Sequence, residues 1–149
     1  MIRNEMRRMV VLAALALMVT VALPALAAKP AAVTGDIELM PAAQARVAAD
    51  GAAGPTYGGY AEFVTDVNGK MASNSTLYVT VVCRQGSEVV YQWSAAPNFA
   101  FPLHDQPGQG LEWNGGDADC SASLIYKIEK GRKYTLTTLD TALFTVAGS

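Results

Sequence analysis

Two cysteines are the residues whose chemistry the sequence constrains most. Cys83 and Cys120 are the only cysteines of the 149-residue chain, and they lie 37 positions apart. Their spacing is not C-x-x-C, and only one histidine is present to join them at a metal ion. In an exported chain such a pair forms a disulfide. We therefore predict a structural Cys83–Cys120 disulfide, worth on the order of 4 kcal/mol in the chain-entropy model.

The single histidine, His104, limits the catalytic chemistry that the chain can perform. A Ser-His-Asp or Cys-His arrangement would need it, but the adjacent Asp105 is poorly placed to orient its ring, and no G-x-S-x-G motif occurs. Paired carboxylates could be drawn from Glu112, Asp117 and Asp119, yet nothing in the sequence places them across a cleft. We interpret His104 as an exposed loop residue and expect neither enzymatic activity nor a cofactor.

Oxygen ligands and an aromatic ring come together in the segment 109–119. Trp113 could stack on a sugar ring while Asn114 and Asp117 hydrogen-bond its hydroxyls. Asp117 and Asp119 lie two positions apart and point the same way. With Asn114 or Glu112 and backbone carbonyls they could hold Ca²⁺, although the EF-hand pattern is absent. The alternative is an ordinary Asx-Gly turn, with Trp113 folded inward to close one end of the fold. These interpretations stay open at this point.

The first 27 residues predict export. They contain a basic start, an apolar run and small residues, in the order Arg3, Arg7 and Arg8, then 9–23, then Ala25-Leu26-Ala27. The apolar run is shorter than the ~20 residues that a membrane-spanning helix needs. This pattern is typical of a secretory signal peptide, with a helical apolar region and cleavage after Ala27. We expect a secreted mature chain.

The mature chain from residue 28 onward holds eight basic and twelve acidic residues, a net charge of −4. A mildly acidic chain of this kind lacks the basic footprint that nucleic acid and anionic membranes require. We therefore expect neither among its partners, and we expect a protein or a glycan outside the cell instead. The length of the mature chain is typical of one domain.

Short segments that alternate apolar and polar side chains recur along the mature chain, as in half-buried strands. Pro-rich surroundings make 99–103 an edge strand, and Asn68-Gly69 predicts a tight turn. We also expect a short helix in 44–49 and a kink at Leu139-Asp140. In the strand 88–93, the side chains that face inward should be Val89, Tyr91 and Trp93. The predicted strands are 36–40, 60–67, 77–83, 88–93, 99–103, 118–126, 133–137 and 143–146, after a flexible tail over 28–35.

Parts of this pattern resemble the immunoglobulin-like β-sandwich superfamily, of the kind found in bacterial secreted proteins. The residues that carry the resemblance are Val81-Val82-Cys83, Trp93, Asp119-Cys120-Ser121-Ala122 and Phe144-Thr145-Val146. The resemblance implies an all-β antiparallel sandwich of about seven strands in a single domain over 36–149. Cys83 would lie on strand B of that fold or, because two predicted strands precede it, on strand C.

A fold of this kind does not determine a function. We expect a secreted, non-catalytic binding or structural module whose loops, chiefly 104–118, contact a partner. The alternative is a carbohydrate or calcium-assisted ligand binder that uses Trp113, Asn114, Asp117 and Asp119. A secreted enzyme or protease inhibitor is the second alternative, although no motif of its own supports it.

Overall fold

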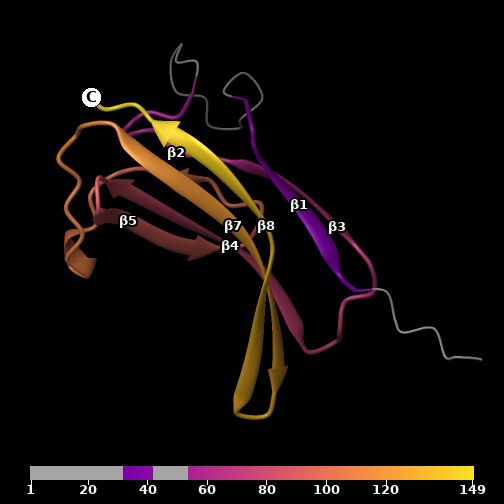
Figure 1. The fold of residues 1–149 in the computed structure, drawn as a ribbon. Helices are drawn as coiled ribbons and strands as arrows, with labels where there is room; N and C mark the ends of the chain where they lie inside the picture. Colours follow the sequence, from indigo (N-terminus) through magenta and orange to yellow (C-terminus); the bar gives the residue numbers. More distant parts are fainter. Residues whose placement is uncertain (1–31, 42–53) are drawn as a thin grey trace, which may run out of the picture.

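Antiparallel strands make up the regular structure of this chain (Figure 1). The computed structural model describes residues 32–41 and 54–149. Within them the only helical element is a single 3-10 turn, Pro107–Gln109 (η1). The all-β prediction is therefore confirmed for the described residues. The predicted signal peptide, its cleavage site after Ala27 and the short helix in 44–49 lie outside them.

The largest unit is a four-stranded antiparallel sheet in the order β5-β4-β7-β8. Its central pair, β4 and β7, stays in register from Ser75 opposite Ile128 to Arg84 opposite Asp119. Gly86 and Gly131 supply the positive φ that a two-residue hairpin turn requires at its first central position. The strands are β4 (Ser75–Gln85), β5 (Glu88–Ala95), β7 (Ala118–Lys130) and β8 (Lys133–Val146).

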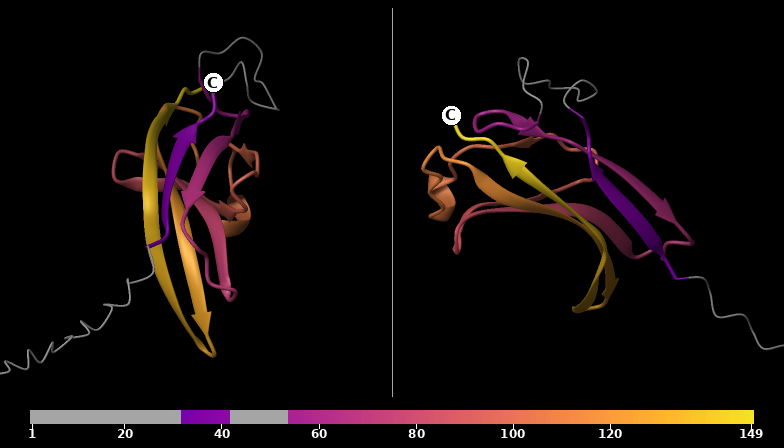
Figure 2. Two further views of the ribbon diagram at one scale, coloured as in Figure 1. Left: turned by 90° about the vertical axis from the view of Figure 1, so that its right-hand side faces the viewer. Right: turned by 45° about the horizontal axis from the view of Figure 1, so that its top comes forward.

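Two smaller antiparallel sheets cover one face of this sheet, which we call the inner face (Figure 2). β1 (Thr34–Leu39) pairs with β3 (Phe63–Asn68), and β2 (Tyr60–Ala61) pairs with β6 (Phe101–Pro102). Their apolar side chains complete a core whose other half comes from alternate residues of β4 and β7. The fully buried members from those two strands are Val79, Val81, Cys83, Ala122 and Leu124. The opposite, outer face of the four-stranded sheet carries the other residues of each strand.

The Cys83–Cys120 disulfide is present and lies inside this core. The two residues stand directly opposite each other on β4 and β7, with their Cα atoms 4.0 Å apart. The bridge therefore joins neighbouring strands of one sheet and does not connect two layers. The prediction of the bond is confirmed, and its position shows that β4 and β7 form the covalent centre of the sheet.

Two bulges alter the strands that the alternation predicted. The register shifts between Cys83 and Arg84, where Val90 is the extra residue of β5, so both Val90 and Tyr91 are buried. The expected inward set was therefore wrong at Val89, which is only half-buried. A second shift makes Leu139 the extra residue of β8, at the predicted kink. β8 nevertheless runs as one strand of 14 residues instead of two short ones.

The N-terminal half departs further from the expected strands. β1 begins at Thr34, inside the predicted flexible tail, because Gly35 allows close packing on β7; a Cβ there would stand 2.9 Å from Leu124 Cδ2. The predicted strand 60–67 is divided into β2 and β3, which pair with different partners. The tight turn at Asn68-Gly69 is wrong, since Asn68 stays extended at the end of β3 and only Gly69 has positive φ.

The Asp140 carboxylate forms a hydrogen bond that holds β1 to β8, an edge strand of the large sheet. The Ile37 backbone N–H donates to Asp140 Oδ2 at 3.0 Å, next to the bulge in β8. This hydrogen bond and a second one from the Thr141 backbone lower the pKa of Asp140 below its ordinary value of 3.8. The bulge therefore places the charged Asp140 carboxylate where it can accept a hydrogen bond from β1. The side chain of Ile37 in β1 lies in the core.

Removal of the disulfide should lower stability without changing the fold. We expect the double variant Cys83→Ala/Cys120→Ala to lose about 2–5 kcal/mol of unfolding free energy, because the unfolded chain is no longer constrained by the 37-residue loop. Chemical denaturation of the mature protein measures this loss. Reduced wild-type protein should behave like the variant, and unchanged stability of both would contradict a structural role.

The Asp140 hydrogen bonds predict a pH-dependent contribution to stability. Because folding lowers this pKa, the contribution is present above pH 3.8 and is lost as the pH falls below that value. We expect wild type to be more stable than Asp140→Asn by a constant margin at pH 5–7, and this margin should shrink on acidification. Denaturation of both proteins across this range measures it. A margin that does not change with pH would exclude the charged interaction.

Candidate functional site

Trp113, for which the sequence left open a sugar platform or an inward-folded ring, is buried. Its side chain is 3% exposed, and its indole N–H donates to the Gly116 carbonyl at 2.9 Å. Tyr57 and Tyr91 meet the ring edge to face, with centroids 5.3 and 6.2 Å away. Its backbone N–H donates to Asp105 Oδ1 at 2.9 Å. The indole closes one end of the core and presents no face to a sugar.

The polar residues around Trp113 serve the local structure. The Asn114 backbone N–H donates to Gln85 Oε1 at 3.4 Å, and Asp117 Oδ1 accepts from the Gly148 N–H at 2.7 Å. Asp119 lies exposed on β7, directly opposite Arg84. Within residues 32–41 and 54–149, no three His, Cys, Asp or Glu side chains come close enough together to hold a metal ion. The polar groups of the segment 109–119 therefore form hydrogen bonds within the fold, to Gln85 of β4 and to Gly148 near the C-terminus.

His104 is an exposed loop residue, as predicted, and its Nδ1 lies 2.7 Å from the carbonyl oxygen of the adjacent Asp105. The same loop reaches the free edge of β5, where Gln106 Oε1 accepts from the Gln92 N–H at 3.0 Å. Among the described residues, neither Gln106 Nε2 nor the buried Tyr91 hydroxyl has a hydrogen-bond partner. Burial raises the pKa of Tyr91 above its ordinary value. The loop thus protects a strand edge and covers the core.

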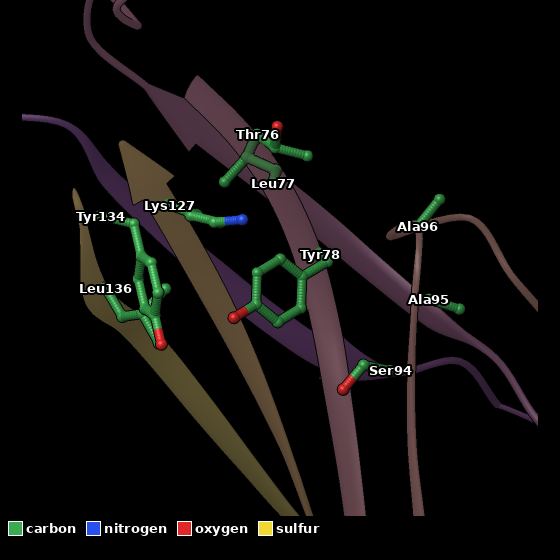
Figure 3. A pocket seen from close by; sticks show the side chains of 9 residues that line it. All are labelled: Thr76, Leu77, Tyr78, Ser94, Ala95, Ala96, Lys127, Tyr134 and Leu136. Carbon is green, nitrogen blue, oxygen red and sulfur yellow. The ribbon is translucent and has the colours of Figure 1, made fainter. Parts of the chain in front are cut away.

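A groove on the outer face gathers two aromatic side chains and a lysine, of which Tyr78 and Lys127 are half-buried (Figure 3). It has a volume of about 700 Å³ and draws residues from all four strands of the large sheet. Tyr134 is 65% exposed and Leu136 is 50% exposed. We call this feature the tyrosine groove. Its lining residues are Thr76, Leu77, Tyr78, Ser94, Ala95, Ala96, Lys127, Tyr134 and Leu136.

Strand register explains why these residues meet. Lys127 lies opposite Thr76 of β4 on one side and opposite Leu136 of β8 on the other, so the three form one row across the sheet. Tyr78 begins the next row, two residues further along β4. Figure 3 shows Tyr78, Lys127 and Tyr134 projecting on the same side of the sheet. The two phenol rings therefore flank a lysine on a surface that is open to solvent.

The groove lysine is held in its charged form. Lys127 Nζ lies 2.5 Å from Glu129 Oε1 and 5.3 Å from the centroid of the Tyr134 ring. The hydrogen bond to Glu129 raises the pKa of Lys127, and the negative charge of Glu129 adds to this effect. A cation placed over an aromatic face orients both groups. The arrangement positions Tyr134 against Lys127 at the floor of the groove.

A row of hydroxyls borders the groove. Ser94, Thr80, Ser123 and Thr141 lie opposite one another across the four strands in that order. The oxygens of Thr80 and Ser94 are 2.8 Å apart, and those of Ser123 and Thr141 are 3.0 Å apart. Each hydroxyl can both donate and accept a hydrogen bond. The outer face therefore combines aromatic rings with hydroxyls in a regular array.

Sequence reasoning did not identify the tyrosine groove. Tyr78, Tyr134 and Leu136 occupy the outward positions of predicted strands, where a polar side chain is the usual choice. That departure from alternation was the available signal. The pairing that brings Tyr78 near Tyr134 depends on the order of the strands, which no local pattern contains.

Comparisons with known proteins do not place the chain in a family. No protein-family model, curated protein or solved structure matches it. In the part of the chain that the structure describes, no helix has the length and apolar character needed to cross a membrane. The immunoglobulin-like resemblance therefore stays a prediction.

The burial of Trp113 leads to a direct test. Trp113→Ala should lower the free energy of unfolding by about 3–5 kcal/mol, because a large core side chain is lost and leaves a cavity. Chemical denaturation measures this loss. In Trp93→Phe, Trp113 is the only tryptophan, and its fluorescence should resist quenching by iodide. Ready quenching together with an unaffected stability of Trp113→Ala would show that the indole is on the surface.

Proposed function

We propose that this chain is an exported, non-catalytic binding module of the immunoglobulin-like sandwich type, and that it binds a carbohydrate in the tyrosine groove. The observation that carries the proposal is the convergence of Tyr78, Tyr134 and Lys127 on the outer face. Export is supported by the signal-peptide pattern over 1–27 and by the Cys83–Cys120 disulfide, a bond that persists in oxidising compartments.

The strand order supports the immunoglobulin-like part of this proposal. A variable-type immunoglobulin sheet extends the G, F and C strands with C′. The order β8-β7-β4-β5 corresponds to G-F-C-C′, with the other small sheets supplying the second layer. This assignment puts Cys83 on strand C and Cys120 on strand F. It also makes the outer face of the β5-β4-β7-β8 sheet the free face of that layer.

The size and chemistry of the groove favour a carbohydrate over a folded protein. A volume of about 700 Å³ is typical of a small-ligand cleft, whereas a standard protein interface covers about 800 Å² on each partner. Phenol rings such as Tyr134 offer an apolar face with a polar tip, which suits a sugar ring and its hydroxyls. Thr76 and Ser94 add hydroxyls within the groove.

The non-catalytic part of the proposal follows from the surroundings of His104. Its Nδ1 contacts the carbonyl of its own neighbour, Asp105, in an exposed loop. The groove itself contains Lys127, whose cation is paired with Glu129, and no histidine or carboxylate among its lining residues. Because its lysine is held as a cation by Glu129, the groove is better suited to holding a ligand than to transferring protons.

Binding should depend on the groove tyrosines. We expect Tyr134→Ala and Tyr78→Ala each to weaken binding of an oligosaccharide selected on a glycan array by roughly fivefold, the effect of losing about 1 kcal/mol of aromatic contact. Calorimetric titration measures the affinities.

Tyr60→Ala is the matched control, since Tyr60 is an exposed tyrosine on β2, outside the groove. It should leave the affinity unchanged. If all three variants bind like wild type, or if no glycan binds, the tyrosine groove is not a carbohydrate site.

A further inference from the structure

The charges of the described residues are divided between two parts of the molecule. The hairpin that connects β7 to β8 holds Lys127, Lys130, Arg132 and Lys133 against one acid, Glu129, over residues 127–133, a net charge of +3. The other described residues hold two basic and ten acidic side chains, a net charge of −8. The overall acidity of the chain thus conceals a basic end. We call residues 127–133 the basic tip.

The basic tip extends away from the acidic body. β4 reaches only Ser75, opposite Ile128, so the last residues of the hairpin continue without a neighbouring strand on that side (Figures 1 and 2). All residues from Glu129 to Thr138 are exposed. Positive charge in this position is available to a partner that approaches the end of the hairpin.

The positive charge of the tip is not compensated by its neighbours. Lys130 lies directly opposite Lys133, and Arg132 occupies the turn between them. Like charges opposite each other on a hairpin are destabilising. Glu129, the only acid of the tip, is already paired with Lys127. A bound anion would relieve this repulsion.

The tip is continuous with the tyrosine groove. Lys127 belongs to both, and Tyr134 of the groove follows Lys133 of the tip directly in β8. Alternation places Lys130 and Lys133 on the opposite face of the hairpin from Tyr134, so a chain of sugar rings that leaves the groove reaches their ammonium groups around the exposed end of the hairpin.

We propose that the ligand of the tyrosine groove is an anionic polysaccharide, with its sugar rings on Tyr78 and Tyr134 and its carboxylate or phosphate groups at the basic tip. This inference rests on the proposed carbohydrate-binding function and adds the charge of the ligand. A thin polymer fits this arrangement, because it can lie in the groove and reach the tip at the same time. A flat anionic membrane that meets the projecting end of the hairpin would leave the groove unoccupied.

The test compares charged and neutral polymers of equal length. Galacturonate oligosaccharides and their carboxyl-reduced, neutral counterparts are titrated against the mature chain at several salt concentrations. We expect the anionic series to bind at least tenfold more tightly, and its affinity to fall with salt as counterions are released.

The triple variant Lys130→Gln/Arg132→Gln/Lys133→Gln should lose that tenfold preference and should lower the slope of log affinity against log salt by about 2. Lys70→Gln/Arg84→Gln is the control, because these are the two basic residues of the described body. It should retain the preference.

The remaining outcomes separate this inference from the proposed function. If neutral and anionic oligosaccharides bind equally and Tyr134→Ala weakens both, the groove binds carbohydrate and the charge inference is overturned. If neither series binds, the charge inference is overturned, and the carbohydrate proposal is decided by the glycan array. Binding of vesicles with anionic lipid, or of duplex DNA, that depends on the tip while galacturonate does not bind would also overturn the inference.

Discussion

The structure depends on the pairing of β4 with β7, which is held both by backbone hydrogen bonds and by a covalent bond. A backbone ladder runs along both strands, and the Cys83–Cys120 disulfide crosses it within the core. Because both cysteines lie on the inner face, the small sheets pack directly over the bond. β5 and β8 are added to the outer edges of this pair by short Gly-containing turns. The register of β4 with β7 therefore determines which side chains meet on the inner face and on the outer face.

Residue alternation predicted the elements that belong to this pair. The β-branched run ending at Cys83 and the small inward residues around Cys120 identify two half-buried strands, and export chemistry predicts their bond. Alternation failed at Val90, because a bulge depends on the partner strand and leaves no local mark. It failed again at Gly35, whose lack of a side chain suggests flexibility but here allows close packing.

The candidate site was less predictable for the same reason. Trp113 lies in a loop rich in Asx and Gly, and composition alone does not decide whether such an indole turns inward. Two hydrogen bonds and two edge-to-face aromatic contacts hold it in the core. The outer-face groove joins Tyr78 to Tyr134, 56 positions later, through two strand pairings. The basic residues of the tip lie within seven positions of the sequence, but a net charge of −2 over the whole chain masked them.

The bulge at Leu139 separates two regions of β8 that differ in burial. Beyond it toward the C-terminus the strand lies under β1 and ends in the core at Val146, whereas the stretch from Lys133 to Thr138 buries no side chain. Amino-acid changes in that stretch therefore do not disturb the packing of the core, whereas changes in the rest of the strand do. This stretch can therefore be redesigned extensively while the scaffold is kept.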